Sequence, residues 1–310
     1  MDFSRTGIEI GPFDIWGTTI NPTLHFYGLL IVIGILAGTS LVAWLVKRED
    51  RDPEHVWNGM MWAVALGVIG ARLWFVFFPP VVTAEAGKDT VWMLKNFFDL
   101  NDGAIAIWSG GLGIFGAVIG GFLGILIYVY RARLTDLWSW VDMAAIGLPL
   151  GHAIGRWGNY VNQELYGKPT DLPWAISIDN PPAKYAEASG FHPLFLYESL
   201  WNLALCSFLL WLWFKHRHRF YKGDFFLIYL MGYAPVRFLL EFLRVEIAEV
   251  PGVGINSSQT ITAIAFVAAA GFFTYRHRIA AIPADKHYDE NAARLKGPSE
   301  RKPKSQRKQV

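Results

Sequence analysis

The chain has 310 residues, of which 53% are hydrophobic and only 17% charged, and its formal net charge is +2. A soluble domain carries about 25% charged residues, so this composition excludes a disordered chain and argues against a soluble globular enzyme. The single cysteine, Cys206, excludes a disulfide framework and a metal cluster built on thiolates. The composition is typical of a protein that crosses a membrane several times.

The first 23 residues contain several charged side chains and no continuous apolar run, so they do not resemble a signal peptide. We expect them to form an external or interfacial segment. Seven apolar stretches follow, each compatible with a helix that crosses a bilayer. They lie at 24–45, 57–78, 104–130, 137–157, 194–214, 225–244 and 258–275, so the predicted transmembrane domain covers residues 24–275.

The last segment, 276–310, is rich in Lys, Arg, Ser and Pro. This composition predicts a disordered, solvated tail, and contact of the tail with anionic lipid is the alternative. The sequence motifs that carry the functional prediction, described below, all lie upstream of this tail. We therefore expect the tail to be dispensable for activity.

Lys and Arg gather on one side of the predicted helices. The loops 45–56, 131–136 and 215–223, together with the tail, carry 19 of the 28 Lys and Arg residues. Positive charge collects in the cytoplasmic loops of membrane proteins. The sequence therefore predicts an all-α polytopic membrane protein with seven transmembrane helices, its N-terminus outside and its C-terminus in the cytoplasm. Two longer segments, 79–103 and 158–193, would form external caps.

Four arginines fall inside or at the ends of these spans, where an unpaired charge costs several kcal/mol. Arg237, Glu241 and Arg244 are spaced so that they share one stripe of a helix. Arg156 is predicted to lie at a similar depth, in the outer half of the membrane. Arg72 has no evident partner, so a functional and a purely structural role remain equally open for it.

A guanidinium group can hold two phosphate oxygens at once, so this cluster predicts a site for the phosphate of an anionic lipid. The alternative is a set of buried Arg–Glu pairs that only lock helices together. The segment 110–113 lies near the outer end of its span, where unwound backbone could approach a ligand. Gly116, Gly120 and Gly124 predict close helix packing, and the histidines lack the spacing of metal ligands.

Five segments, in order along the chain, resemble the signatures of the bacterial prolipoprotein diacylglyceryl transferase family. The longest is 155–167 (GRWGNYVNQELYG), and the others are 26–29 (FYGL), 107–112 (IWSGGL), 192–198 (HPLFLYE) and 237–244 (RFLLEFLR). The resemblance implies a multi-pass enzyme of the bacterial plasma (inner) membrane whose active site faces the outer leaflet. It implies no cofactor, no metal ion and no nucleic-acid partner.

The resemblance also implies a reaction, the first step of bacterial lipoprotein maturation. The diacylglyceryl group of phosphatidylglycerol would pass to the lipobox cysteine of a preprolipoprotein signal peptide, which forms a thioether and releases glycerol phosphate. Arg156 and Arg237, with Gly110 and Gly111, would bind phosphatidylglycerol, and Glu241 and Arg244 would orient Arg237. The catalytic residues that the resemblance implies are Tyr27, Asn159, Glu164, Gly167, Arg237, Glu241 and Arg244.

One position departs from the family pattern. Many members carry His-Gly-Gly shortly after the motif at 107–112, where this chain has Phe115, Gly116 and Ala117. Either another residue acts as the base, with His152, His192 and Glu198 as candidates, or no side-chain base is needed. A lipid transporter and a non-catalytic lipid-binding scaffold are the alternatives to an enzyme. Consumption of phosphatidylglycerol in the presence of a lipobox peptide would distinguish them.

Overall fold

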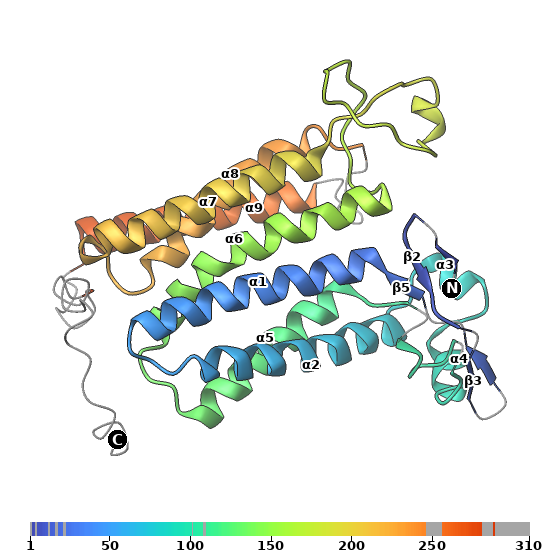
Figure 1. The fold of residues 1–310 in the computed structure, drawn as a ribbon, viewed down its shortest axis with the longest axis horizontal. Helices are drawn as coiled ribbons and strands as arrows, with labels where there is room; N and C mark the ends of the chain where they lie inside the picture. The colour runs from blue at the N-terminus through green and yellow to red at the C-terminus, as the bar shows by residue number, and fades with distance from the viewer. Residues whose placement is uncertain are drawn as a thin grey trace. The chain divides into compact units, whose positions relative to one another are not determined.

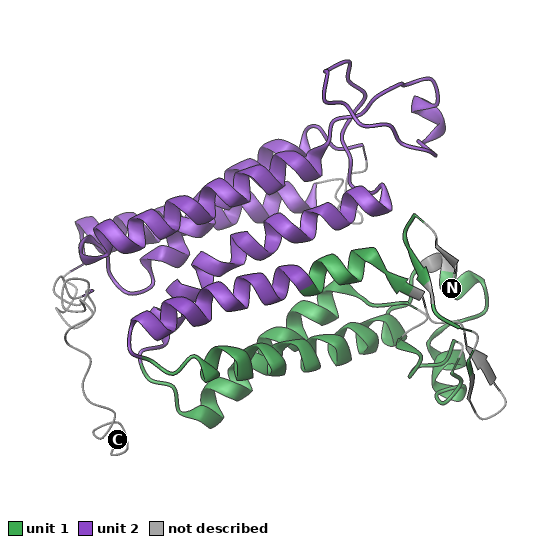
Figure 2. Cartoon of the chain, in the orientation of Figure 1, with its two compact units in different colours: residues 1–32, 51–135 green, residues 33–50, 136–310 purple. Residues whose placement is uncertain are grey.

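The computed structural model describes residues 2–3, 5–11, 13–15, 18–20, 23–100, 102–107, 110–245, 256–280 and 288. The chain divides into two compact units, which Figure 2 colours separately. Unit 1 contains residues 1–32 and 51–135, and unit 2 contains residues 33–50 and 136–310. The division falls inside helix α1 (Phe26–Arg48). Nearly all of the predicted tail lies outside the described residues, as do Trp108 and Ser109 of the motif at 107–112.

Unit 1 is built on two long helices, α2 (Glu54–Phe77) and α5 (Ile114–Ala132), which lie side by side (Figure 1). A Cβ atom on Gly116 would lie 2.0 Å from the carbonyl oxygen of Gly70, and one on Gly120 would lie 2.1 Å from that of Leu66. Any side chain at these positions would therefore push the two helices apart. The contacts confirm the prediction that these small residues serve close helix packing.

Two short helices, α3 (Val81–Glu85) and α4 (Thr90–Lys95), follow α2. The carboxylate of Asp89 caps α4 by accepting a hydrogen bond from the backbone N–H of Trp92 at 2.8 Å. Met93 of α4, Val76 of α2 and Ala104 form a small buried apolar cluster. This cluster holds the chain that follows α4 against α2.

The N-terminal segment forms short antiparallel strands, which the sequence analysis did not predict. Strands β1 (Asp2–Phe3), β2 (Gly7–Glu9) and β5 (Thr23–His25) pair in the order β1-β2-β5. Strands β3 (Phe13–Ile15) and β4 (Thr18–Ile20) pair with each other. Strands of two or three residues are too short to show the alternation of apolar and polar residues by which a strand is recognised.

Unit 2 contains four further long helices: α6 (Leu137–Asn162), α7 (Leu194–His216), α8 (Asp224–Glu241) and α9 (Ser257–Arg278). Helix α6 packs on α7 and α8, and α8 also packs on α7 and α9 (Figure 1). The part of α1 in this unit approaches α6 closely, since a Cβ atom on Gly38 would lie 2.9 Å from the carbonyl oxygen of Gly147.

The segment between α6 and α7, which is part of the predicted external cap 158–193, has little regular structure. It contains one 3₁₀ turn, η2 (Ala183–Tyr185), and three isolated β-bridges. Two bridges join Phe191 to Pro169 and to Ile176, and the third joins Gly167 to Arg244. The segment is therefore tied to the end of α8 as well as to itself.

Among the described residues, five helical segments are long and apolar enough to cross a membrane: α1, α2, α5, residues 194–219 (α7 with the 3₁₀ turn η3, Arg217–Arg219) and α9. Helices α6 and α8, the fourth and sixth predicted spans, are not among these five: α6 carries Asp142 and Arg156, and α8 carries Asp224, Arg237 and Glu241. The third predicted span, 104–130, becomes helical only at Ile114. The structure thus supports a mostly helical membrane protein, while the number of seven spans and their sidedness stay predictions.

A polar cluster lies where α6, α8 and α9 meet near the basic segments 215–223 and 276–278. The fully buried carboxylate of Asp224 accepts hydrogen bonds from Arg276 and His277 at 2.8 and 2.7 Å. The carboxylate of Asp142 accepts backbone N–H groups from the start of α8 and the hydroxyl of Tyr288. We call this group the basic-end cluster. Its hydrogen bonds join α6, α8, α9 and Tyr288, which indicates a structural role.

Candidate functional site

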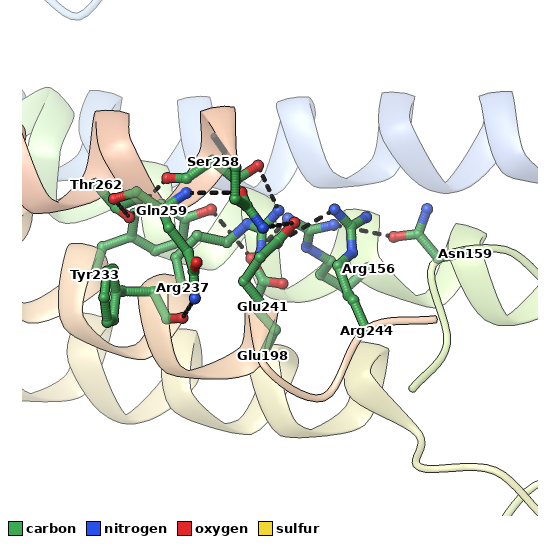
Figure 3. Close-up of polar contacts among 12 residues, drawn as sticks. Arg156, Asn159, Glu198, Tyr233, Arg237, Glu241, Arg244, Ser258, Gln259 and Thr262 are labelled. Carbon is green, nitrogen blue, oxygen red and sulfur yellow. Dashed lines mark hydrogen bonds and ion pairs between the residues drawn. The ribbon is translucent and has the colours of Figure 1, made fainter. Parts of the chain in front are cut away.

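A second polar cluster lies in unit 2, around the carboxylate of Glu241 at the end of α8. Glu241 is almost fully buried and pairs with Arg237, one helical turn earlier, and with Arg244 at 3.4 Å. Figure 3 shows that the side chains of Arg237 and Arg244 both point toward this carboxylate. The prediction that these three residues come together is confirmed, but only Arg237 and Glu241 lie on α8, and Arg244 contacts Glu241 from three residues beyond the end of the helix.

Helix α9 closes this group from the other side. The amide of Asn256, just before α9, donates to the Oε1 atom of Glu241 at 3.3 Å. Arg237 donates through its other terminal nitrogen to the hydroxyl of Ser258 at 3.2 Å. Glu241 is thus surrounded by three donors, and one buried carboxylate fixes the direction of two guanidinium groups.

Arg156, on α6, is held by a separate carboxylate. It donates to the Oε1 atom of Glu198, on α7, at 2.6 Å, and the hydroxyl of Tyr233, on α8, donates to the same oxygen at 3.1 Å (Figure 3). Helices α6, α7 and α8 are therefore joined through one buried oxygen atom. Removal of either donor would leave Glu198 partly unsatisfied in an apolar environment, which is costly.

Asn159 connects Arg156 to the segment between α6 and α7. Its carbonyl oxygen accepts from Arg156 at 3.3 Å, and its amide nitrogen donates to the carboxylate of Glu164 at 2.7 Å. The positions of Arg156 and Asn159, three residues apart on α6, place both on one face of the helix. Both residues, which the sequence analysis proposed as site residues, therefore belong to the same hydrogen-bond chain as Glu164.

Gly167 lies next to the cluster as part of the backbone. Its N–H donates to the carbonyl of His192 at 2.9 Å, and it forms a β-bridge with Arg244. A Cβ atom on Gly167 would lie 2.7 Å from the Cβ atom of His192 and 3.0 Å from the carbonyl oxygen of Leu243. Glycine is required there because a side chain would separate this backbone from Arg244.

The guanidinium groups of Arg156, Arg237 and Arg244 line one small cavity in unit 2. Its volume is about 10 Å³, room for about one water molecule. The remaining lining residues are Asn159, Leu165, Leu194, Phe195, Glu198 and Leu240. A cavity of this size holds no phosphate group without a rearrangement of the side chains around it.

The other predicted site residues, Tyr27, Gly110 and Gly111, lie in unit 1. Gly110 and Gly111 have φ angles of +89° and +69°, so the backbone there requires glycine. Arg72, also in unit 1, is buried and donates to carbonyl oxygens of this same segment. The structure therefore groups Arg156, Asn159, Glu164, Gly167, Arg237, Glu241 and Arg244 in unit 2, and Tyr27, Gly110 and Gly111 in unit 1.

Three residues of the unit 2 cluster did not emerge as site residues from the sequence: Tyr233, Asn256 and Ser258. Tyr233 precedes Arg237 by four residues on an apolar helix, and this spacing could have pointed to it. Asn256 accepts from the N–H of Gln259 and so caps α9. A cap is recognisable from sequence, but the contact of its amide with another helix is not.

Comparison with known proteins identifies the family. A family model described as prolipoprotein diacylglyceryl transferase matches residues 16–275. A phosphatidylglycerol–prolipoprotein diacylglyceryl transferase from Synechococcus elongatus is 38% identical over 274 residues, 86% of this chain and 86% of that protein. Proteins of the same name from Chloroflexus aggregans and Paenarthrobacter aurescens are 34% and 35% identical, each over 86% of this chain and 88% and 80% of their own lengths. The chain therefore belongs to the prolipoprotein diacylglyceryl transferase family.

Proposed function

We propose that this protein transfers the diacylglyceryl group of phosphatidylglycerol to the thiol of a lipobox cysteine in a preprolipoprotein. Membership of the transferase family supports this reaction. The observation that carries the assignment of the site is the shared cavity of Arg156, Arg237 and Arg244, because clustered guanidinium groups are suited to a phosphate leaving group.

The reaction is an alkyl transfer from a phosphate ester to sulfur. The cysteine thiolate of the prolipoprotein attacks the carbon of the diacylglyceryl group that bears the phosphate ester oxygen. A carbon–sulfur bond forms, the carbon–oxygen bond breaks, and glycerol phosphate leaves with the electron pair. The thiol proton is released to a base or to water. The one cysteine of this chain, Cys206, is buried and donates to the carbonyl of Ile146, so the substrate supplies the thiol.

Arg237 and Arg156 are the proposed phosphate ligands. Each keeps donors beyond those used by its carboxylate, because a guanidinium group has five N–H groups. Glu241 orients Arg237 and Arg244, and Glu198 orients Arg156. Since the cavity has room for about one water molecule, binding of the lipid requires these side chains to exchange part of their contacts for phosphate oxygens.

The remaining catalytic residues take supporting roles in this proposal. Asn159 and Glu164 position Arg156 through their hydrogen-bond chain, and Gly167 allows the external segment to approach Arg244. Tyr27 is assigned to the site because it matches the family motif at 26–29. The hydroxyl of Tyr27 would then contact substrate, and its replacement by Phe should reduce turnover with little change in stability.

A histidine base at position 115 is absent in this chain. Phe115 is 64% exposed, and its ring contacts that of Trp74 at a centroid distance of 5.4 Å. The Oε1 atom of Glu198 already accepts hydrogen bonds from both Arg156 and Tyr233. We propose that the arginine cluster itself favours the thiolate, since a nearby positive charge lowers the pKa of a thiol.

The charge asymmetry of the sequence supports seven spans, including α6 and α8, with the N-terminus external and the site facing the outer leaflet of the plasma membrane. Reporter fusions test this orientation. A reporter that requires the cytoplasm should be active at the C-terminus and inactive at the N-terminus. The reverse result would place the site on the other side of the membrane.

Transfer itself is tested with purified protein, phosphatidylglycerol and a lipobox peptide. We expect a diacylglyceryl thioether on the peptide and one glycerol phosphate released per thioether, and no product from a peptide with Ser in place of Cys. Binding of phosphatidylglycerol without its consumption would indicate a lipid-binding scaffold. Movement of the lipid between leaflets without peptide would indicate a transporter.

A further inference from the structure

Arg72 is the one arginine of the predicted spans without an assigned role, and its contacts in unit 1 are distinctive. The Nε atom donates to the carbonyl of Ala104 at 2.8 Å, and one terminal nitrogen donates to that of Gly103 at 2.6 Å. The other terminal nitrogen donates to the carbonyls of Gly110 and Gly111 at 2.6 and 3.1 Å. All four acceptors are backbone oxygens of one segment, 103–111.

These bonds determine which way the peptide groups of the segment face. In a trans peptide the C=O and the following N–H point in opposite directions. Because the carbonyls of Gly110 and Gly111 point at Arg72, the N–H groups of Gly111 and Leu112 point away from it. Among the described residues, neither of these two N–H groups has a hydrogen-bond partner.

The two glycines also differ in how closely other residues approach them. A Cβ atom on Gly111 would lie 2.6 Å from the ring of Phe75 and 2.9 Å from Arg72, so this residue is pressed against α2. A Cβ atom on Gly110 would have no neighbour within 4 Å among the residues that the structure describes. The N–H of Gly113 is anchored to the carbonyl of Ala71 at 2.9 Å. One face of the segment is therefore fixed to α2 and the other is open.

We propose that Arg72 is a positioning residue for lipid binding: through its bonds to Gly103, Ala104, Gly110 and Gly111 it holds the backbone so that the N–H groups of Gly111 and Leu112 bind an anionic oxygen of phosphatidylglycerol. Consecutive N–H groups beside residues of positive φ are a known form of anion site. The segment also leads directly into the first turn of α5, whose N–H groups lack intrahelical partners. This inference rests on the proposed function for the identity of the lipid.

The test compares Arg72→Lys and Arg72→Ala with Lys88→Ala. Lys88 pairs with Asp102 next to the same segment, but both side chains are exposed. A lysine ammonium group donates from one point and cannot span Ala104 and Gly110 as the guanidinium fork does. We expect Arg72→Lys to raise the KM for phosphatidylglycerol about tenfold, the equivalent of one charge-assisted hydrogen bond. The KM for the peptide and the melting temperature should stay near those of the wild type, as should all values for Lys88→Ala.

Binding of phosphatidylglycerol is also measured without turnover, by displacement of a fluorescent phosphatidylglycerol from the protein in detergent. Failure of the transferase assay alone would then count against the proposed function, whereas unchanged lipid affinity in Arg72→Lys would overturn the role of Arg72. A loss of kcat with unchanged lipid affinity would also overturn it.

A backbone substitution keeps the proposal testable if the arginine variants do not fold. Replacement of Leu112 by its α-hydroxy acid removes one N–H and keeps the side chain. We expect weaker binding of phosphatidylglycerol. The same replacement at Gly113 removes the N–H that is bonded to Ala71, so it should lower stability and leave lipid affinity unchanged. Equal lipid affinity in the Leu112 ester and the wild type would contradict the proposal.

Discussion

Arg72 in unit 1 and Arg237 in unit 2 carry the same charge on hydrophobic chain segments, but different groups neutralise them. Arg72 donates to four backbone carbonyl oxygens. Arg237 donates to the carboxylate of Glu241 and the hydroxyl of Ser258. A carbonyl oxygen moves only when the chain moves, whereas a carboxylate or hydroxyl can change partner by a side-chain rotation. Arg72 is therefore suited to shape a segment, and Arg237 is suited to accept a new anion.

The comparison also separates two classes of arginine within unit 2. Arg217, which belongs to the basic segment 215–223, is buried and pairs with Glu49. Arg156, Arg237 and Arg244 instead share a cavity. A buried ion pair by itself is weak evidence of function, so the cavity distinguishes the proposed site from a structural pair.

The largest expected effect is that of Arg237. Arg237→Ala should lower kcat/KM about 10²- to 10³-fold, as for the loss of one group that stabilises a developing anion. Arg237→Lys should recover only part of this, because lysine keeps the charge but loses the fork that holds two phosphate oxygens. Steady-state kinetics with phosphatidylglycerol and a lipobox peptide provide the measurement.

The control for this prediction is Arg217→Lys, which alters a buried Arg–Glu pair outside the cavity. We expect it to change the melting temperature more than the activity. If Arg237→Lys equalled the wild type, or if Arg217→Lys lost as much activity, the distinction between a phosphate ligand and a structural pair would be wrong.

A smaller effect is expected at Tyr233. Tyr233→Phe removes the hydroxyl that donates to Glu198 at 3.1 Å, and so leaves Arg156 as the main partner of that carboxylate. Loss of one hydrogen bond to a charged group should reduce kcat/KM about tenfold. Tyr229→Phe is the matched control, since its ring stacks on that of Tyr233 at 5.9 Å. Equal losses in the two variants would show that the hydrogen bond from the Tyr233 hydroxyl to Glu198 has no special role in the reaction.

Residues within one helix were predictable from spacing, and contacts between segments were not. Arg237 and Glu241 were grouped correctly because the helical repeat places them one turn apart, whereas Arg244 reaches Glu241 from the turn that follows α8. The contacts of Glu241 with Asn256 and of Arg237 with Ser258 join two helices, and nothing in the spacing of either helix specifies them.

Arg72 shows a stricter limit of sequence reasoning. Its partners are backbone carbonyls, which every residue has, so no side-chain pattern marks them. The start of α5 at Ile114 was also not predicted, because the apolar residues of 104–113 cannot be distinguished by composition from the helix that follows them. The short N-terminal strands were missed for lack of any alternation long enough to detect.

Phe115 tests whether this protein needs a base at the position where many relatives have His. Phe115→Ala should change activity less than about threefold, because the exposed ring loses only its contact with Trp74. The rate should rise with pH as a thiol of pKa near 8.5 titrates. His152→Ala and His192→Ala should each retain most activity. Loss of turnover in either variant, with phosphatidylglycerol still bound, would indicate a relocated histidine base.

The smallest effect on activity is expected from the tail, and here the structure adds a detail that sequence did not provide. Tyr288 lies within the predicted tail, yet only 9% of it is exposed. Its ring contacts those of Trp213 and Phe225 at centroid distances of 5.2 and 6.1 Å, and its hydroxyl donates to Asp142 at 2.6 Å. The last residues therefore divide into Tyr288, which belongs to the basic-end cluster, and the segment 289–310 beyond it.

Two truncations distinguish these parts. Removal of 289–310 should change neither activity nor melting temperature. Removal of 286–310 should leave specific activity unchanged but lower the melting temperature by about 2–4 °C, the effect of about 1 kcal/mol in a protein of this size. The loss is limited because Asp142 still accepts the N–H groups of Gly223 and Phe226 at 2.6 and 3.0 Å.

The pH dependence of the tail contact follows from its chemistry. Burial, and then the nearby carboxylate of Asp142, raise the pKa of Tyr288 above its ordinary value of about 10. A raised pKa in the folded state means that the stabilisation is fully present below pH 10 and is lost only at higher pH. The difference in melting temperature between the two truncations should therefore be the same at pH 7.5 and pH 9. Tyr288→Phe in the full chain should lose only the part of this stabilisation that comes from the hydrogen bond to Asp142. A loss of specific activity in any of these variants would show that the basic-end cluster acts on the reaction and not only on stability.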